Sequence, residues 1–188
     1  MISRERAYEI LKDYVKDERM VKHCLACEAV MRALATRFGE DPEIWGLVGL
    51  LHDLDYEEAK EDFSRHGRLT PRILREGYGV DLPDFVLRAI EAHAGHPGAE
   101  PRTLLERAIY AVDPTTGFVI ACAMIHKDRR LSSIDVDFML KRFKEKRFAA
   151  GADRSIIASC EEGLGIPLPE FLGLALEAMK GIASELGL

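Results

Sequence analysis

The sequence predicts an all-α fold in a single domain. Apolar residues recur at spacings of three and four through most of the 188 residues, which is the period of helices packed on a core. The alternation of apolar and polar residues that marks a strand is nearly absent, and we find no internal repeat or low-complexity stretch. A chain of this length can bury about 70% of the surface that its unfolded form exposes, which is enough for one hydrophobic core.

The first two helices are predicted from their cap residues and apolar spacing. Ser3 is a suitable N-cap for a helix that runs to about Tyr14. A second helix is expected over 20–38, where Gly39 follows the last apolar residue and can close the helix in a left-handed conformation.

A third helix should begin at Asp41-Pro42, an N-cap followed by a first-turn proline. It is apolar nearly all round in the stretch WGLVGLL, so we expect it at the centre of the molecule. This apolar run ends abruptly at His52, Asp53 and Asp55. Burying such groups without partners costs several kcal/mol, so either good hydrogen bonds or a bound ion must stabilise them.

Seven further helices complete the prediction, over residues 65–76, 83–94, 103–112, 117–126, 134–146, 153–163 and 168–186. Pro71 indicates a kink or a boundary within the first of these. Stretches rich in glycine and proline predict the connecting loops 77–79, 95–101 and 165–169. We expect residues 1–188 to form one domain, with the functional residues within 20–120 and a helical extension, 121–188, packed on them.

Composition and charge exclude several classes of partner. The chain has 26 Lys and Arg against 32 Asp and Glu, a net charge of −6, which argues against binding to nucleic acid or to an anionic membrane. No run reaches about 18 consecutive apolar residues, and the N-terminus lacks the apolar core of a signal peptide. We therefore expect a cytoplasmic protein whose four cysteines are reduced thiols. Cys24 and Cys27 are expected to be small buried groups, because no second pair completes a zinc site.

Seven polar residues interrupt the apolar helices at or near their ends: His23, His52, Asp53, His66, His93, His96 and Asp113. Helices packed in a bundle can bring such ends into one pocket, which is how bundle metal sites are built. Neutral imidazole and carboxylate suit Fe, Mn, Co or Zn. Asp53 could bridge two ions with its two oxygens, and two metals about 3.5–4 Å apart are an arrangement used for phosphoester hydrolysis. The sequence thus predicts a site for one or two divalent ions, with Fe or Mn favoured.

The order of these residues resembles the HD superfamily of metal-dependent phosphohydrolases, in which a histidine, a His-Asp pair and a distant aspartate lie on helices. The matching residues are His23 in VKHCLAC, His52-Asp53 in LLHDLDYE and Asp113 in AVDPTTGF. Dinuclear members add two histidines between the pair and the last aspartate, where this chain has His66 in RHGRLT and His93 in AIEAHAGH. The resemblance covers roughly residues 20–120 and implies an HD-type helical bundle with these six residues as metal ligands.

The histidine spacing looks particularly similar to the bacterial branch that includes diadenosine tetraphosphate hydrolases. Leu54-Asp55-Tyr56 follows the His-Asp pair, where cyclic-dinucleotide phosphodiesterases have Ile-Gly-Lys, so that substrate class is not favoured. The resemblance implies hydrolysis of a phosphoester or phosphoanhydride in a small, nucleotide-like substrate. Residues 121–188 match no motif and could shape the pocket or a homodimer interface.

Residues beside the predicted ligands also receive roles. Asp53 and Asp55 are candidate catalytic residues; Asp55 could orient a metal-bound histidine, protonate the leaving alkoxide, or be only a solvated loop carboxylate. His96 follows His93 by three residues and is a candidate to contact the substrate or to support a ligand. Three flanking cations could neutralise phosphate oxygens: Lys60, Arg65 and Arg68.

Two other functions use a similar ligand set. Di-iron oxygenases such as inositol oxygenase resemble the pattern equally well at the metal, but they consume oxygen and do not release phosphate. A nucleotide-sensing module with a slow or inactive site would bind nucleotide tightly without turnover. A hydrolase is the preferred interpretation.

Overall fold

The computed structural model describes residues 1–188 and contains helices and turns but no strand, so the all-α prediction is confirmed. Its elements in chain order are α1 (Arg4–Tyr14), α2 (Glu18–Phe38), α3 (Pro42–Leu51), α4 (Tyr56–Ala59), η1 (Phe63–Arg65), α5 (Thr70–Arg72), η2 (Ile73–Gly77), α6 (Asp84–Ala92), α7 (Leu104–Ile125), η3 (Leu131–Ser133), α8 (Val136–Phe143), α9 (Arg154–Ala158), α10 (Cys160–Leu164), α11 (Leu168–Lys180) and α12 (Ala183–Leu186). The predicted caps are present: Ser3 and Asp41 each accept a hydrogen bond from a first-turn amide, and Gly39 is left-handed with φ 72°.

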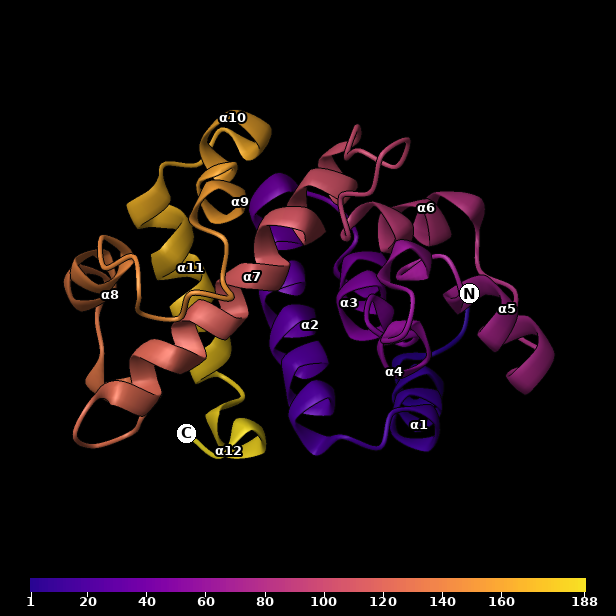
Figure 1. Ribbon diagram of the computed structural model, residues 1–188, viewed down its shortest axis with the longest axis horizontal. Helices are drawn as coiled ribbons and strands as arrows, with labels where there is room; N and C mark the ends of the chain where they lie inside the picture. The colour runs from indigo at the N-terminus through magenta and orange to yellow at the C-terminus, as the bar shows by residue number, and fades with distance from the viewer.

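The two longest helices, α2 and α7, pack against each other in the middle of the molecule (Figure 1). Helices α1, α3 and α6 lie on one side of this pair, and α8 to α11 lie on the other. One continuous hydrophobic core runs through all of these helices. Helix α3 is buried from Trp45 to Leu51, as its all-round apolar sequence predicted.

Helices α2 and α3 approach each other closely because Gly49 has no side chain. A Cβ atom added at Gly49 would lie 2.8 Å from the backbone of Cys27, a distance that real Cβ atoms essentially never show. The contact therefore fixes the separation of α2 from α3. It thereby also fixes the distance between His23 in α2 and His52, which directly follows α3.

We expect Gly49→Ala to destabilise the protein by about 1–3 kcal/mol, because the added methyl group overpacks a helix contact that cannot open without moving backbone. Thermal unfolding followed by circular dichroism should show a lower midpoint. Gly117→Ala is the matched control, since nothing lies within 4 Å of a Cβ there. That change should stabilise α7 by about 0.5–1 kcal/mol. Equal midpoints for the two variants would contradict the close-packing argument.

The prediction of separate helices over 103–112 and 117–126 is wrong, because α7 is continuous and contains Pro114. A proline inside a helix removes one hydrogen bond and costs about 3 kcal/mol. Both flanks are buried here, Val112 before the proline and Phe118 after it. Burial of the flanks outweighs the local cost and joins the two predicted helices into one.

The segment 65–76 is also not a single helix. The backbone turns at Gly67, whose φ of 79° is in the left-handed region that favours glycine. The helical conformation resumes at Thr70, with Pro71 in the first turn, so the boundary that Pro71 predicted is present. The turn matters for function because His66 lies within it.

Three predicted C-terminal helices are shorter or broken. Helix α8 ends at Phe143 because the guanidinium group of Arg154 donates to the carbonyls of Phe143, Ala149 and Ala152, which holds the following segment in turns. The predicted helix 153–163 is interrupted at Ser159, which separates α9 from α10. The predicted helix 168–186 ends at Lys180, and α12 is a separate short helix.

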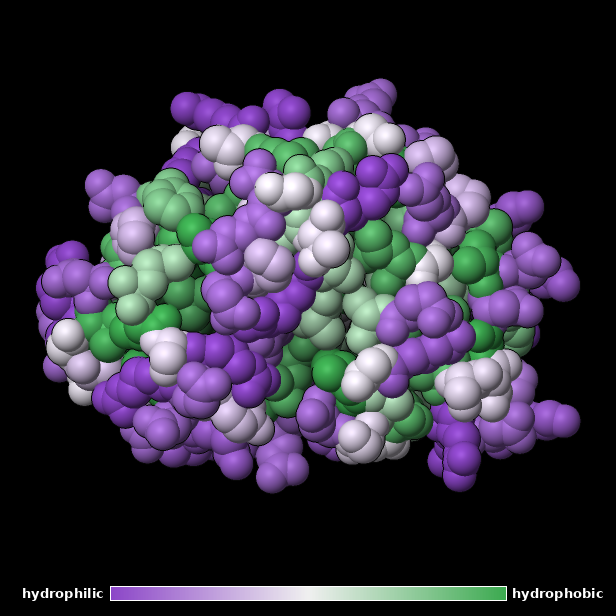
Figure 2. Space-filling model, turned by 180° about the vertical axis from the view of Figure 1, so that it is seen from behind, coloured by the Kyte–Doolittle hydropathy of each residue, from purple (hydrophilic) through white to green (hydrophobic).

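Helix α7 is long and apolar enough to cross a membrane by length and composition, with a mean hydropathy of 1.6 over its most apolar window. In the fold its apolar side chains, among them Ile109 and Val119, are buried between neighbouring helices, so the core accounts for its composition. Figure 2 shows one face of the molecule, on which hydrophilic residues surround separate apolar patches. Five large apolar side chains are exposed: Met1, Phe63, Phe85, Met124 and Ile125.

Candidate metal centre

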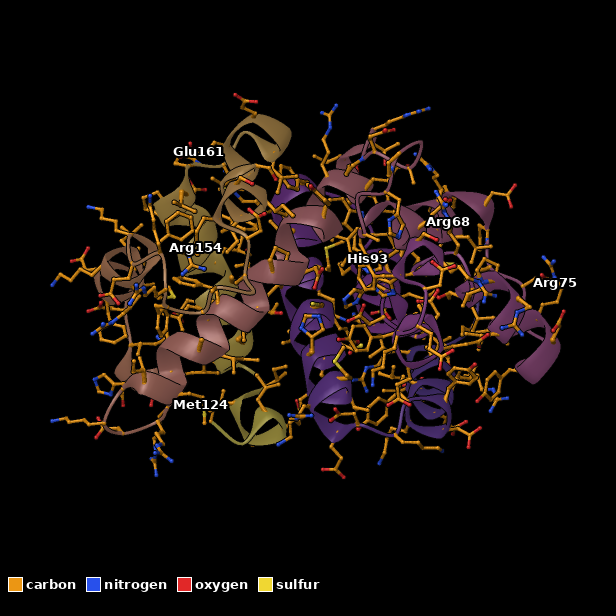
Figure 3. All side chains as sticks on the ribbon, in the orientation of Figure 1. Arg68, Arg75, His93, Met124, Arg154 and Glu161 are labelled. Carbon is orange, nitrogen blue, oxygen red and sulfur yellow. The ribbon has the colours of Figure 1, made fainter.

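The six residues of the predicted ligand set lie in one cluster, although they come from five parts of the chain: His23, His52, Asp53, His66, His93 and Asp113. Two of the histidines follow directly on the last residues of α3 and α6, and His23 and Asp113 lie within α2 and α7. Figure 3 shows His93 near the middle of the molecule, where side chains from these helices converge. His52 and His93 thus lie at helix ends as expected, but the expectation that Asp113 follows a helix end is wrong, because α7 continues through it.

Asp53 lies between two pairs of imidazoles. Its Oδ2 is 3.4 Å from Nε2 of His23 and 3.5 Å from Nε2 of His52. Its Oδ1 is 3.1 Å from Nε2 of His66 and 3.4 Å from Nε2 of His93. Each carboxylate oxygen thus faces a different pair of nitrogen donors, which is the arrangement a bridging carboxylate needs.

Asp113 places a second carboxylate beside the pair His23 and His52, but not beside the pair His66 and His93. Its Oδ1 is 3.0 Å from Nε2 of His23 and 3.8 Å from Nε2 of His52. The side chain of Asp113 is 32% exposed, whereas that of Asp53 is 6% exposed. The centre is therefore open to solvent at the Asp113 end and closed beneath Asp53.

Backbone carbonyls determine which nitrogen of two buried histidines carries the proton. Nδ1 of His52 lies 2.8 Å from the Gly49 carbonyl, and Nδ1 of His93 is hydrogen-bonded to the Ile90 carbonyl. A carbonyl can only accept, so both Nδ1 atoms must donate. Nε2 of each neutral ring then keeps its lone pair, which is the form that binds a metal.

In the other two histidines, side chains instead of backbone carbonyls accept the hydrogen bond from Nδ1. Nδ1 of His66 donates to Oδ1 of Asp55 over 2.9 Å. Nδ1 of His23 lies 3.0 Å from Oγ1 of Thr116, whose hydroxyl donates in turn to the Asp113 carbonyl. In its neutral form, each of the four imidazoles therefore directs the lone pair of Nε2 into the centre.

This donor set fits divalent cations. The Nε2 atoms of His23 and His52 are 3.2 Å apart, and those of His66 and His93 are 2.9 Å apart. Two lone pairs at such distances repel each other unless a proton or a cation lies between them. Nitrogen and carboxylate oxygen suit Fe, Mn, Co and Zn. Each half of the cluster could thus hold one ion, with Asp53 shared.

Without a cation, protons must bind to the cluster to relieve the repulsion between its closely spaced nitrogen and oxygen atoms. Burial opposes protonation of His52, but Asp53, Cys27 and Asp113 together outweigh it and raise the pKa of His52 to about 9. Burial likewise opposes protonation of His66, and its hydrogen bonds to Asp53 and Asp55 raise its pKa to about 9. Burial also works against ionisation of Asp53, yet the surrounding histidines, His52 foremost, lower its pKa well below the ordinary value. A metal ion would replace these protons.

Asp55 is fully buried and supports His66. Its Oδ1 accepts from His66 and from the backbone amide of Gly67 at 3.0 Å, and its Oδ2 accepts from the amide of Leu69 at 2.9 Å. The solvated-loop interpretation is therefore excluded. Because both oxygens are occupied, the geometry favours an orienting role for Asp55 over that of a general acid.

We expect Asp55→Asn to weaken metal binding about 10–100-fold, which is the usual effect of removing a residue that orients a metal-bound histidine. The amide cannot accept from both Nδ1 of His66 and the two backbone amides. Calorimetric titration of the metal-free variant with Mn²⁺ measures the loss. Asp81→Asn, at an exposed carboxylate that pairs only with Arg75, should leave the affinity unchanged. An unchanged affinity for Asp55→Asn would refute the orienting role.

His96 also contacts the His66 turn. Its Nε2 donates to the His66 carbonyl over 3.0 Å, and its side chain is partly exposed. This bond favours a role in holding the turn, and it leaves Nδ1 of His96 free for another partner. A direct catalytic role for His96 stays a prediction.

The three predicted phosphate-binding cations differ in their surroundings. Arg68 is bound to Glu91 over 3.0 Å and to two backbone carbonyls, and Figure 3 shows it on the outer side of His93, so its charge is already compensated. Lys60 lies over the ring of Tyr56 at 5.4 Å, and both Lys60 and Arg65 are exposed. The structure thus leaves Lys60 and Arg65 available and gives Arg68 a structural role.

Sequence reasoning missed some supports of the centre. Thr116 lies one turn after Asp113, so helical spacing could have predicted that the two share a face. The contacts to the carbonyls of Gly49 and Ile90 could not be predicted from the sequence, because every residue has a backbone carbonyl. Cys27 is buried, as expected, but its Sγ is also 3.8 Å from Nε2 of His23, close enough to join a potential metal-ligand group. The four-residue spacing from His23 to Cys27 suits a shared zinc ion, but the lack of a second cysteine pair favoured a purely structural role for Cys27.

Comparison with known proteins adds one match. The HD domain family matches residues 20–116, just over half of the chain, and this span contains all six residues of the cluster. No curated protein matches the chain at a significant level.

Proposed function

The chain belongs to the HD domain family, whose members are generally metal-dependent hydrolases, and on this premise we propose that it cleaves a phosphoester or phosphoanhydride bond in a small, nucleotide-like substrate. We propose further that it resembles the dinuclear branch of the family that includes diadenosine tetraphosphate hydrolases, and that it acts in the cytoplasm.

One observation carries the proposal of a dinuclear centre. The two oxygens of Asp53 face different histidine pairs, so one carboxylate can belong to two metal sites at once. A mononuclear site would not need His66 and His93 to direct two further Nε2 atoms at the opposite oxygen. We favour Fe or Mn, because the set is rich in imidazole and carboxylate and poor in thiolate.

The chain's own residues define how such a centre would work. Bound divalent cations would polarise a phosphoryl group and lower the pKa of water. The four imidazoles and Asp53 fix the donor atoms before any ligand arrives, because hydrogen bonds at each Nδ1 prevent the rings from turning. Solvent reaches the centre at Asp113, its most exposed carboxylate.

The charge of the protein supports a small substrate. A chain with net charge −6 does not attract a polymeric polyanion, but a local metal centre still binds a single phosphate group. Lys60 and Arg65 remain available to neutralise further phosphate oxygens.

The test combines metal analysis with a substrate screen. Protein stripped with chelator and reloaded with Mn²⁺ or Fe²⁺ should contain two ions per chain and release phosphate or nucleotide from dinucleoside polyphosphates or mononucleotides. Activity should disappear with chelator and return with metal. Oxygen consumption without phosphate release would identify an oxygenase, and tight nucleotide binding without turnover would identify a sensing module. A chain that retains no metal under any condition would refute the enzyme proposal.

A further inference from the structure

Phe63 is an exposed aromatic residue directly beside the metal centre. Its side chain is 54% exposed, although it is large and apolar. Its ring lies against that of His66, with centroids 4.7 Å apart and an interplanar angle of 33°. The imidazole whose Nε2 faces Asp53 is therefore covered on one side by a ring whose other side meets solvent.

Local hydrogen bonds hold Phe63 in this position. It begins the single turn η1, which Asp62 caps by accepting from the amide and the hydroxyl of Ser64. The amide of His66 donates to the Phe63 carbonyl over 3.1 Å. The exposed ring is thus presented by an ordered turn and is tied to a predicted metal ligand.

The surroundings of Phe63 favour a small aromatic ligand over a protein partner. A protein interface requires a contiguous apolar patch, whereas the residues next to Phe63 in the chain are polar or charged: Lys60, Glu61, Asp62, Ser64 and Arg65. His96 stands edge-on to the Phe63 ring at 6.0 Å. The site therefore offers one flat apolar surface directly beside the candidate metal centre.

We propose that Phe63 is the surface on which the base of a nucleotide substrate stacks while its phosphate lies at the metal centre. The ring then determines specificity: it favours phosphate esters that carry a planar aromatic group over those that lack one. Stacking on an aromatic side chain accepts any base, because every base has a π face. The proposal rests on the phosphohydrolase function but can be tested by binding alone.

The test compares two probes that differ only in the base, AMP and ribose 5-phosphate, by calorimetric titration of Mn²⁺-loaded protein. The wild-type protein should bind AMP about tenfold more tightly than ribose 5-phosphate. Phe63→Ala and Phe63→Leu should reduce that ratio toward one, and Phe63→Trp should keep it. Phe85→Ala is the matched control, since Phe85 is 52% exposed and lies in α6 away from the cluster, and it should keep the wild-type ratio.

The outcomes separate this inference from the proposed function. A wild-type protein that binds AMP no better than ribose 5-phosphate overturns the stacking role, whether or not it hydrolyses either probe. A tenfold preference that Phe63→Ala removes supports the role even if no phosphate is released, in which case the hydrolase proposal alone fails. Metal content is measured for every variant. If Phe63→Ala and Phe63→Leu both lose metal in proportion to AMP binding, Phe63 only supports His66 and the inference is wrong.

Discussion

Replacement of Asp53 by asparagine should remove metal binding and turnover together, by at least about 100-fold each. The change keeps the size of the side chain but leaves one oxygen acceptor where two are needed. An amide nitrogen would then face one of the two histidine pairs, and an N–H group cannot bind a cation. Because Asp53 is the only group within 3.5 Å of both pairs, neither half of the centre should keep its affinity.

Elemental analysis and a phosphate-release assay on the same preparation test this expectation. Asp137→Asn, at an exposed carboxylate of α8 outside the cluster, is the control and should retain full metal content. An Asp53→Asn protein that is fully metallated and active would show that the bridge is not needed. One retained ion per chain with no activity would assign the loss to one half of the centre.

Removal of the metal should lower the thermal stability of the protein, and the size of the effect should grow with pH. At a free metal concentration 100 times the dissociation constant, binding contributes about 2.7 kcal/mol, or about 5–10 °C in the unfolding midpoint for a domain of this size. The difference between loaded and stripped protein should be larger at pH 8 than at pH 6.

The direction follows from the two histidines whose pKa is raised to about 9, His52 and His66. A raised pKa means that protonation stabilises the metal-free fold fully below the ordinary value of 6.5, and that this contribution is lost as the pH rises through about 9. The lowered pKa of Asp53 acts oppositely, since its contribution is lost only in acid. Metal binding must expel the two histidine protons, so metal affinity increases by up to about tenfold per pH unit for each.

Thermal unfolding at pH 6, 7 and 8, with Mn²⁺ and with chelator, measures both trends. The midpoint of the stripped protein should fall from pH 6 to pH 8 while the shift caused by Mn²⁺ increases. A shift that is constant across this range would mean that the histidines are already unprotonated in the metal-free protein.

The helical class and the six residues of the candidate cluster could both be predicted from sequence patterns alone. The three- and four-residue periods predict helices because each helix must bury one face, and that requirement acts within a short segment. His52 and Asp53 were recognised because they end an apolar run, where an unsatisfied charge is costly. The order of histidines and aspartates carried the family resemblance, and the match to residues 20–116 agrees with it.

How the six residues are arranged around Asp53, and which groups orient them, depends on the packing of the helices. That Asp53 faces one histidine pair with each oxygen depends on how α2, α3, α6 and α7 pack, and no local spacing encodes that packing. The backbone carbonyl of residue 49 orients His52, and a residue of any type at that position has such a carbonyl, so the sequence does not predict this contact. Burial of α7 likewise overrode the helix-breaking tendency of Pro114, because packing free energy summed over two flanks exceeds a local backbone cost. Short-range patterns identify which side chains need a partner; which partner each one meets is determined by contacts between residues far apart in the chain.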